Sequence, residues 1–144
     1  MKRAFAHIFI VVITAILSSC KTPDQPLGGG ILKFSPEEAT LGPEGGVAVS
    51  YAEDFTQIWD IAAYVDGKLF FKIDVTDEDQ TIPYTRSVSD YCTIVRPEKE
   101  RVEVHLPPRS EGNFRIVILG MGYNETEKVE LYGGRFVVDQ IVEE

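Results

Sequence analysis

The chain has 144 residues, of which 44% are hydrophobic, 10% aromatic and 26% charged. This length suits one ordinary domain, and the composition is typical of a folded globular protein rather than of a disordered tail or a multi-span membrane protein. The formal net charge is −9. Because a phosphate backbone is bound by clustered Lys and Arg, the acidic balance argues against nucleic acid as a partner and against direct adhesion to anionic lipid headgroups.

Residues 1–19 predict a secretory signal peptide that is removed. Lys2 and Arg3 are followed by an apolar stretch from residue 4 to residue 17 that ends in Leu17-Ser18-Ser19-Cys20. The stretch is shorter than the roughly 20 residues that span a bilayer, which fits a cleaved segment. The ending has the pattern of a lipobox, in which an apolar side chain and two small ones precede a cysteine whose thiol takes a diacylglyceryl group. We therefore predict lipidation at Cys20, and the alternative is an ordinary signal peptide whose cysteine is incidental.

Residues 20–30 predict a lipidated tether, because two prolines and three consecutive glycines follow Cys20. Ten extended residues reach roughly 30 Å. Two or more lipid chains give stable anchoring where one chain is only marginal, so the membrane is the expected partner of this segment. Lys21 does not match an inner-membrane retention signal built on Asp, which favours the outer membrane of the cell envelope and leaves its periplasmic or surface face open.

Residues 31–144 predict a single all-β domain. Short β-branched and aromatic runs alternate with Gly, Pro, Asp and Ser clusters, and no long stretch shows the helical period. The clearest unit is a hairpin whose two strands flank Asp66-Gly67, the pair that a two-residue type I′ turn requires. Thr76 to Asp90 is polar and is expected to be a long loop. About eight strands, which suit a β-sandwich, are expected within residues 32–34, 47–51, 57–65, 68–75, 91–96, 101–106, 114–119, 129–132 and 135–141.

Several short motifs resemble BACON domains, which are immunoglobulin-like modules of lipoproteins and secreted glycan enzymes of the Bacteroidetes. The motifs are Gly45-Gly46 before Val47–Tyr51, Trp59-Asp60-Ile61, Val102-Glu103-Val104 leading through Pro107-Pro108 to Arg115–Ile118, and Val137–Gln140. The resemblance implies an immunoglobulin-like antiparallel β-sandwich and a glycan-binding or spacer role. The chain departs from the pattern in its long hairpin, in the acidic residues 77–79 and in the lack of a second Trp, and no residue role transfers from the family.

Catalytic and metal-binding chemistry has little support in the sequence. His105 shares a face of its strand with Arg101 and Glu103, so it is expected to be a solvated surface residue. Cys92 has no partner in the chain once Cys20 is lipidated and is expected to be a small buried hydrophobe, with an intermolecular disulfide left open. We expect no enzyme activity, no metal and no cofactor. A carboxylate pair for glycoside hydrolysis stays a minor alternative.

Sugar binding requires exposed aromatic rings beside polar groups. The candidate platforms are Tyr84, Tyr91, Tyr123 and Tyr132, whereas Trp59 is expected to pack in the core between the sheets. Phe70 and Phe71 are adjacent in a strand and are expected to face opposite sides of it. The sequence thus predicts a non-catalytic, lipid-anchored binding or spacer module that interacts with a polysaccharide or with another envelope protein.

Overall fold

The computed structural model describes residues 32–52, 55–75, 81–124 and 126–143. The predicted signal peptide, the tether and Cys20 lie outside these residues. Within them the chain forms strands and no helix, so the described part contains no helix able to cross a membrane. The ten strands are β1 (Phe34–Ser35), β2 (Glu38–Leu41), β3 (Gly46–Ala52), β4 (Phe55–Val65), β5 (Lys68–Asp74), β6 (Tyr84–Ser89), β7 (Cys92–Glu98), β8 (Arg101–Leu106), β9 (Phe114–Asn124) and β10 (Val129–Gln140).

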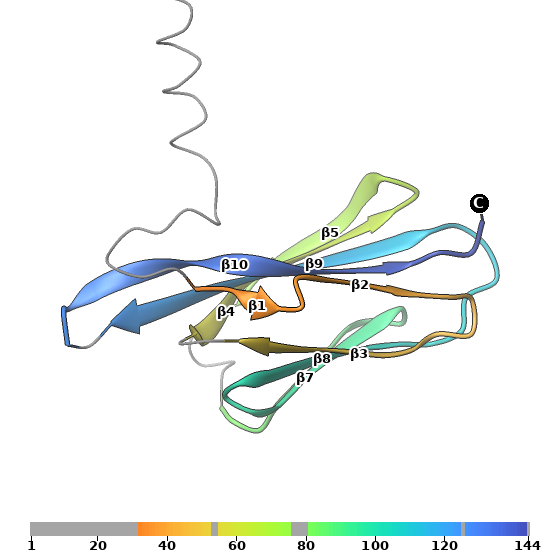
Figure 1. The fold of residues 1–144 in the computed structure, drawn as a ribbon. Helices are drawn as coiled ribbons and strands as arrows, with labels where there is room; N and C mark the ends of the chain where they lie inside the picture. Colours follow the sequence, from red (N-terminus) through yellow and green to blue (C-terminus); the bar gives the residue numbers. More distant parts are fainter. Residues whose placement is uncertain (1–31, 53–54, 76–80, 125, 144) are drawn as a thin grey trace, which may run out of the picture.

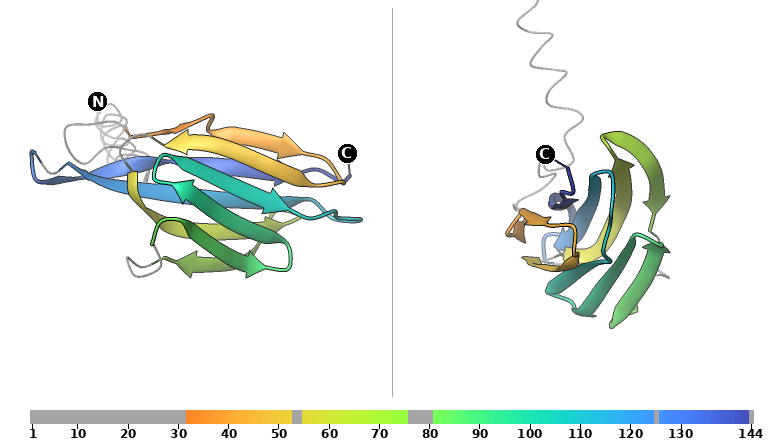
Figure 2. Two further views of the ribbon diagram at one scale, coloured as in Figure 1. Left: turned by 90° about the horizontal axis from the view of Figure 1, so that it is seen from below. Right: turned by 90° about the vertical axis from the view of Figure 1, so that its right-hand side faces the viewer.

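The strands form two five-stranded sheets that pack face to face (Figures 1 and 2). Sheet I has the order β1-β3-β8-β7-β6, and sheet II has the order β2-β10-β9-β4-β5. Neighbouring strands are antiparallel except β2 and β10, which are parallel. The predicted all-β, mainly antiparallel sandwich is confirmed, although the described strands number ten rather than about eight.

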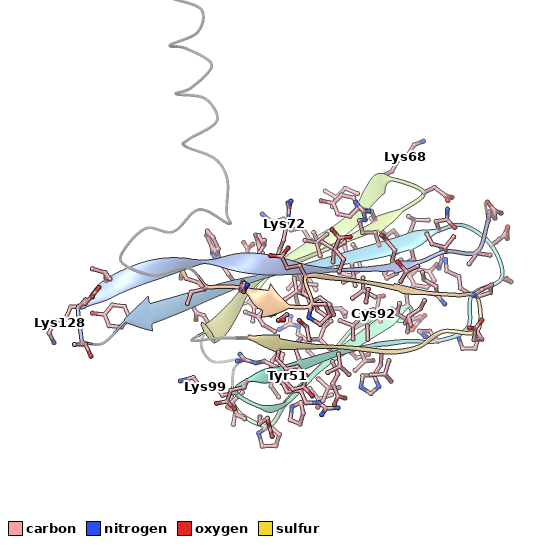
Figure 3. All side chains as sticks on the ribbon, viewed as in Figure 1. Tyr51, Lys68, Lys72, Cys92, Lys99 and Lys128 are labelled. Atoms are coloured by element: carbon pink, nitrogen blue, oxygen red, sulfur yellow. The ribbon has the colours of Figure 1, made fainter. Side chains whose placement is uncertain are left out.

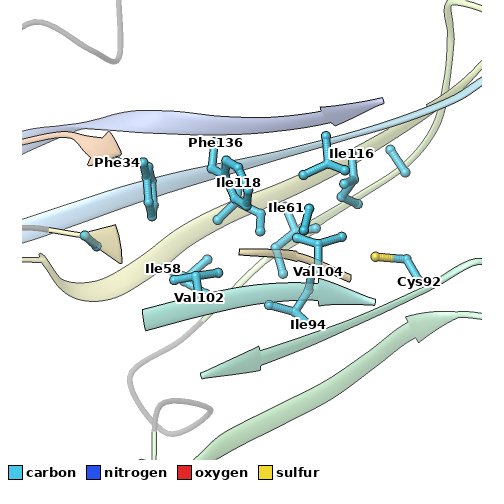
Figure 4. Close-up of a cluster of buried hydrophobic side chains, with 14 of the residues drawn as sticks. Phe34, Ile58, Ile61, Cys92, Ile94, Val102, Val104, Ile116, Ile118 and Phe136 are labelled. Carbon is cyan, nitrogen blue, oxygen red and sulfur yellow. The ribbon is translucent and has the colours of Figure 1, made fainter. Parts of the chain in front are cut away.

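The core lies between the sheets and follows from strand alternation. In β8, Val102, Val104 and Leu106 are buried, while the three residues between and before them face outward. β9 belongs to sheet II, and its Ile116 and Ile118 are fully buried in the same core (Figure 4). Each such aliphatic side chain contributes roughly 1.5–3 kcal/mol when it leaves water. The burial of these inward faces therefore fixes which residues of each strand are presented to solvent.

Cys92 points into this core (Figure 4) and is 1% exposed. Burial raises the pKa of its thiol to about 12. The prediction of a small buried hydrophobe is confirmed, and the thiol stays protonated at neutral pH. Because the thiolate is the reactive form of cysteine, Cys92 is a poor nucleophile in the folded protein.

The Asp66-Gly67 turn has the predicted geometry. Asp66 and Gly67 have φ angles of 49° and 82°, which are the two positive values of a type I′ turn. The turn joins β4 to β5, which pair in an antiparallel ladder. The hairpin prediction is therefore confirmed.

Two strands were missed because both are polar edge strands. β6 lies within the segment expected to be a loop, and it pairs only with β7 at the edge of sheet I. β2 pairs only with β10 at the edge of sheet II. Edge strands bury less of their surface, so their sequences lack the apolar alternation that predicts a strand. A third difference is that residues 129–132 and 135–141 contribute to one strand, β10, with a register shift between Tyr132 and Arg135.

The prediction that Trp59 packs in the core is wrong. A register shift between Ile58 and Asp60 in the pairing of β4 with β9 places a bulge at Trp59. Ile58 and Ile61 are buried on the inner side, and Trp59 is only partly buried. Simple alternation cannot locate a bulge, since the extra residue inverts the pattern that follows it.

Substitutions at Gly45 and Gly67 form a matched pair that separates backbone strain from steric collision. Both have positive φ angles, of 77° and 82°. A Cβ on Gly45 would lie 2.2 Å from the Leu106 carbonyl oxygen, whereas a Cβ on Gly67 would meet nothing within 4 Å. We expect Gly67→Ala to lower the free energy of unfolding by about 1 kcal/mol, from the backbone conformation alone. Gly45→Ala should cost at least about 2 kcal/mol more, and equal losses in urea denaturation would contradict the packing at Leu106.

Candidate ligand-binding groove

The outer side of sheet II carries a groove of about 700 Å³. Strands β2, β4, β9 and β10 supply its floor and sides, and Gly67 and Asn113 line the end at the β4–β5 turn and the β8–β9 loop. In Figure 1 the tip of the β4–β5 hairpin stands above β9 and β10. The four lining strands, about 4.8 Å apart, span roughly 14 Å, and pockets of roughly 300–1,000 Å³ are usual for ligands. The groove thus has the volume of a usual ligand-binding pocket.

The strand register explains the chemistry of the groove, because outward-facing residues on neighbouring strands form rows across the sheet. The polar row, Thr40, Asp139, Arg115, Tyr64 and Leu69, runs from β2 to β5. The next row along the strands is apolar in its centre and charged at both ends: Glu38, Val137, Val117, Ala62 and Lys72. The groove therefore offers an aromatic ring and hydrogen-bonding groups beside an aliphatic floor.

Arg115 and Asp139 form a bidentate ion pair in the polar row. Arg115 Nε donates to Asp139 Oδ1 at 2.8 Å, and Nη2 donates to Oδ2 at 3.1 Å. The hydrogen bond and the charge of Asp139 raise the pKa of Arg115. The Arg115 side chain is 55% exposed and that of Asp139 is 24% exposed, so the pair is held in a fixed geometry and still reaches solvent. Such a pair can donate and accept hydrogen bonds to the same hydroxyl-bearing ligand.

A second group of charges lies beside the groove on β4 and β5. Lys72 Nζ is 3.1 Å from Asp60 Oδ2 and 4.0 Å from Asp74 Oδ1. Burial raises the pKa of Asp60, and the carboxyl of Asp74 adds to this effect while Lys72 opposes it. The hydrogen bond to Asp60 raises the pKa of Lys72. Figure 3 shows Lys72 on sheet II and Tyr51 on sheet I.

Asn113 links three segments of the chain at one end of the groove. Its backbone N–H donates to Asp66 Oδ1 at 2.9 Å, and its carbonyl accepts from the Asp66 N–H at 2.8 Å. Its side-chain Oδ1 accepts from the N–H groups of Val142 and Glu143 at 2.8 and 3.0 Å. One residue thus joins the β4–β5 turn, the β8–β9 loop and the segment after β10.

The four predicted tyrosine platforms do not form one site. Tyr84 is 4% exposed, so its ring is buried, and Tyr123 is 42% exposed. Tyr91 contacts Phe114 at the start of β9, and Tyr123 lies nine residues further along that strand, roughly 30 Å away. The side chain of Tyr132 lies outside the described part of the chain. Of the three tyrosines whose side chains the structure describes, none lines the groove.

Tyr91 belongs to an aromatic cluster that connects the edges of the two sheets. Its ring centroid is 5.4 Å from that of Phe70 and 5.6 Å from that of Phe114. The guanidinium carbon of Arg109 lies 4.5 Å from the Tyr91 centroid, within cation–π range. These neighbours occupy much of the ring surface, so the role of Tyr91 in the structure is to pack.

The prediction that Phe70 and Phe71 face opposite sides is wrong. The pairing of β4 with β5 shifts between Ala63 and Tyr64, which pair with Phe71 and Leu69 and leave Phe70 without a cross-strand partner. The rings of Phe70 and Phe71 are 5.6 Å apart, so both lie on one side of the strand. The bulge turns Phe70 toward Tyr91 of the other sheet.

His105 lies on the outer face of sheet I, as predicted. Its Nε2 is 2.8 Å from Glu103 Oε1, and Arg101 Nε donates to Glu103 Oε2 at 2.8 Å. The hydrogen bond from His105, supported by Arg101, lowers the pKa of Glu103. In the described residues, no three His, Cys, Asp or Glu side chains gather as a metal site.

Tyr64, Arg115 and Asp139 are the groove residues that the sequence analysis missed. Tyr64 was counted only as part of the hairpin strand, and Arg115 and Asp139 are 24 residues apart. The alternation of inward and outward residues places each of them on an outer face. What brings them together is the pairing of β9 with both β4 and β10, which no local pattern reveals.

No family model matches the sequence, and none of the curated proteins compared with it matches. Among solved structures, the chain is similar to an NMR structure of a protein from Bacteroides thetaiotaomicron. The two share 12% sequence identity over 83% of this chain and 85% of that chain, with a TM-score of 0.45.

We expect Asn113→Ala to release the segment after β10, because the amides of Val142 and Glu143 lose their acceptor. A neutral hydrogen bond contributes about 1 kcal/mol, so exchange of these two amides should become several-fold faster. Hydrogen exchange followed by NMR measures this. Asn113→Asp keeps an acceptor oxygen and is the control. Unchanged exchange in Asn113→Ala would show that the groove end is held by other contacts.

Proposed function

We propose that this chain is a non-catalytic, lipid-anchored protein of the cell envelope whose groove on sheet II binds glycan. The observation that carries the proposal is the row in which Tyr64 lies next to the Arg115–Asp139 pair. Sugar rings pack their C–H faces on aromatic rings while their hydroxyls take hydrogen bonds. Tyr64 can supply the first contact, and the ion pair can supply the second.

The shape of the groove supports an extended ligand over a small one. It crosses four strands of sheet II and reaches Gly67 and Asn113 at one end. Val117 and Val137, which lie in its floor, are only partly buried and offer aliphatic surface beside the polar row. A polysaccharide segment has the same mixture of apolar ring faces and hydroxyl edges.

We also propose that the sandwich is immunoglobulin-like. In that topology one sheet has the order A-B-E-D and the other contains G-F-C. Taking β3, β4, β9 and β10 as strands B, C, F and G, the order β10-β9-β4 is G-F-C and the order β1-β3-β8-β7 is A-B-E-D. The added strand β6, next to β7, departs from this scheme. The motifs that resemble BACON domains agree with such a fold, and their family implies a glycan-binding or spacer role.

For the location of the protein, we propose the outer membrane, with Cys20 as the lipidated residue. The lipobox, the tether and Lys21 support this. The inertness of Cys92 also supports it, since a buried thiol whose pKa is raised to about 12 is no alternative acylation site.

A structural or protein-interaction role is the second candidate. It is favoured by Val47 and Tyr51 on the outer face of sheet I, which are 47% and 51% exposed. They lie beside the charged row of Arg101, Glu103 and His105 on β8. This face would serve a protein partner rather than a soluble ligand.

The glycan proposal predicts that Tyr64→Ala weakens polysaccharide binding at least tenfold, which corresponds to about 1.4 kcal/mol. Affinity electrophoresis of the detergent-solubilised full chain through gels that contain a range of polysaccharides measures retention. Tyr51→Ala is the matched control, because it removes an exposed tyrosine from the other sheet. If no polysaccharide retards the wild-type chain, the glycan proposal is wrong. If Tyr51→Ala alone abolishes retention, the site lies on sheet I.

The anchor proposal predicts that Cys20→Ala abolishes incorporation of labelled fatty acid in cells. Cys92→Ala should retain full labelling, since Cys92 is buried between the sheets. Continued labelling of Cys20→Ala would show that the lipid is attached elsewhere.

A further inference from the structure

We infer that the groove selects glycans that carry no carboxylate or sulfate groups. The inference rests on the proposed glycan-binding function and names the ligand class of the same site. Its basis is that cationic side chains on the outer face of sheet II form ion pairs with acidic side chains of the same face.

Acidic side chains outnumber cationic ones by one among the residues that line the groove. Glu37, Glu38 and Asp139 face two cations, Arg115 and Arg135. The whole chain carries a net charge of −9. The net charge of the chain therefore repels a polyanionic ligand, which slows its approach and weakens its binding at low ionic strength.

The side-on donors of Arg115, which form one of its two bidentate edges, are already occupied. A guanidinium recognises a carboxylate through two parallel N–H donors, and Arg115 already directs Nε and Nη2 at Asp139. Glu38, two strands away, is a further acidic charge that acts on Arg115. A ligand carboxylate would reach only the outer N–H groups of Arg115, where it would lie close to the like charge of Asp139. A neutral hydroxyl meets no such repulsion.

Lys72, which lies beside the groove on sheet II, also forms ion pairs with neighbouring acids. Its ammonium is 3.1 Å from Asp60 and 4.0 Å from Asp74. Arg135 is the remaining cation, and in the strand register it lies diagonally across from Glu38, because Glu38 pairs with Val137 two residues further along β10. With strands about 4.8 Å apart and a rise of about 3.3 Å per residue, the two residues are roughly 8 Å apart, so the negative charge of Glu38 reduces the attraction of Arg135 for an anion.

The paired charges suit hydroxyl groups. A hydroxyl both donates and accepts, and Asp139 accepts while the outer N–H groups of Arg115 donate. The two side chains hold each other in place, so little side-chain freedom is lost when a ligand binds. Tyr64, next in the row, supplies the ring on which an uncharged pyranose can pack.

The test compares neutral and acidic polysaccharides on the same protein. The full chain in neutral detergent is run through gels that contain mannan, β-glucan, unsubstituted xylan or galactan, and through gels that contain polygalacturonate, alginate or chondroitin sulfate. Each gel is run at 50 and 500 mM NaCl. We expect retention by at least one neutral polymer, a change of less than twofold with salt, and no retention by the acidic polymers.

Charge variants test the cause of the selectivity. The double variant Glu38→Gln with Asp139→Asn removes two acids from the groove and frees Arg115, so it should gain retention by polygalacturonate at 50 mM NaCl. Glu98→Gln on sheet I is the control and should gain none. Circular dichroism and urea denaturation show that each variant is folded, and Asp139→Asn alone serves if the double variant is not.

The outcomes separate the inference from the function on which it rests. Retention of the wild-type chain by an acidic polymer, lost in Tyr64→Ala and weakened at least tenfold by 500 mM NaCl, overturns the inference and leaves the glycan function standing. Failure of the folded charge variants to gain polygalacturonate binding also overturns it. Absence of retention by every polymer overturns both.

Discussion

The burial of one face of every long strand against the opposite sheet is the constraint on which the rest of this structure depends. Ile61, Ile116 and Ile118 of sheet II are fully buried against the inner face of sheet I. Because side chains alternate along a strand, this packing forces Tyr64, Arg115 and Val117 outward. The groove is thus a consequence of the core, and its residues share a face because their neighbours in sequence are buried.

A second feature is that charged side chains on both outer faces form ion pairs with each other. On sheet II, Asp139 holds Arg115 and Asp60 holds Lys72. On sheet I, Glu103 holds both Arg101 and His105. Exposed ion pairs contribute little to folding stability, so these pairs do not determine the fold. They bring donors and acceptors together on each outer face, which is the property on which the proposed glycan binding relies.

Much of the fold could be predicted from the sequence wherever a local rule applies. The Asp66-Gly67 pair specifies its turn through two positive φ angles, and the alternation in β8 specifies which of its residues are buried. The errors occurred where the rule depends on tertiary pairing. Trp59 and Phe70 lie at register shifts, which invert the expected side, and β2 and β6 are edge strands with too little burial to produce an apolar pattern.

The candidate site was less predictable than the fold because the two outer faces have similar compositions. Each carries a tyrosine, valines and an arginine paired with an acid: Tyr51 and Arg101 on sheet I, and Tyr64 and Arg115 on sheet II. The groove described here is on sheet II, where the parallel strand β2 lies at one edge and the β4–β5 hairpin at the other.

The same hairpin explains why the predicted tyrosines and the groove residues differ. Tyr91 is drawn into the cluster with Phe70 and Arg109 that secures the edge of sheet II to sheet I. Asp66 in the turn bonds to Asn113, which in turn bonds to the segment after β10. The β4–β5 hairpin is therefore held along β5 by aromatic packing and at its turn by hydrogen bonds. A surface held in this way is preorganised, and the proposed glycan binding would then depend on the side chains already arranged on it.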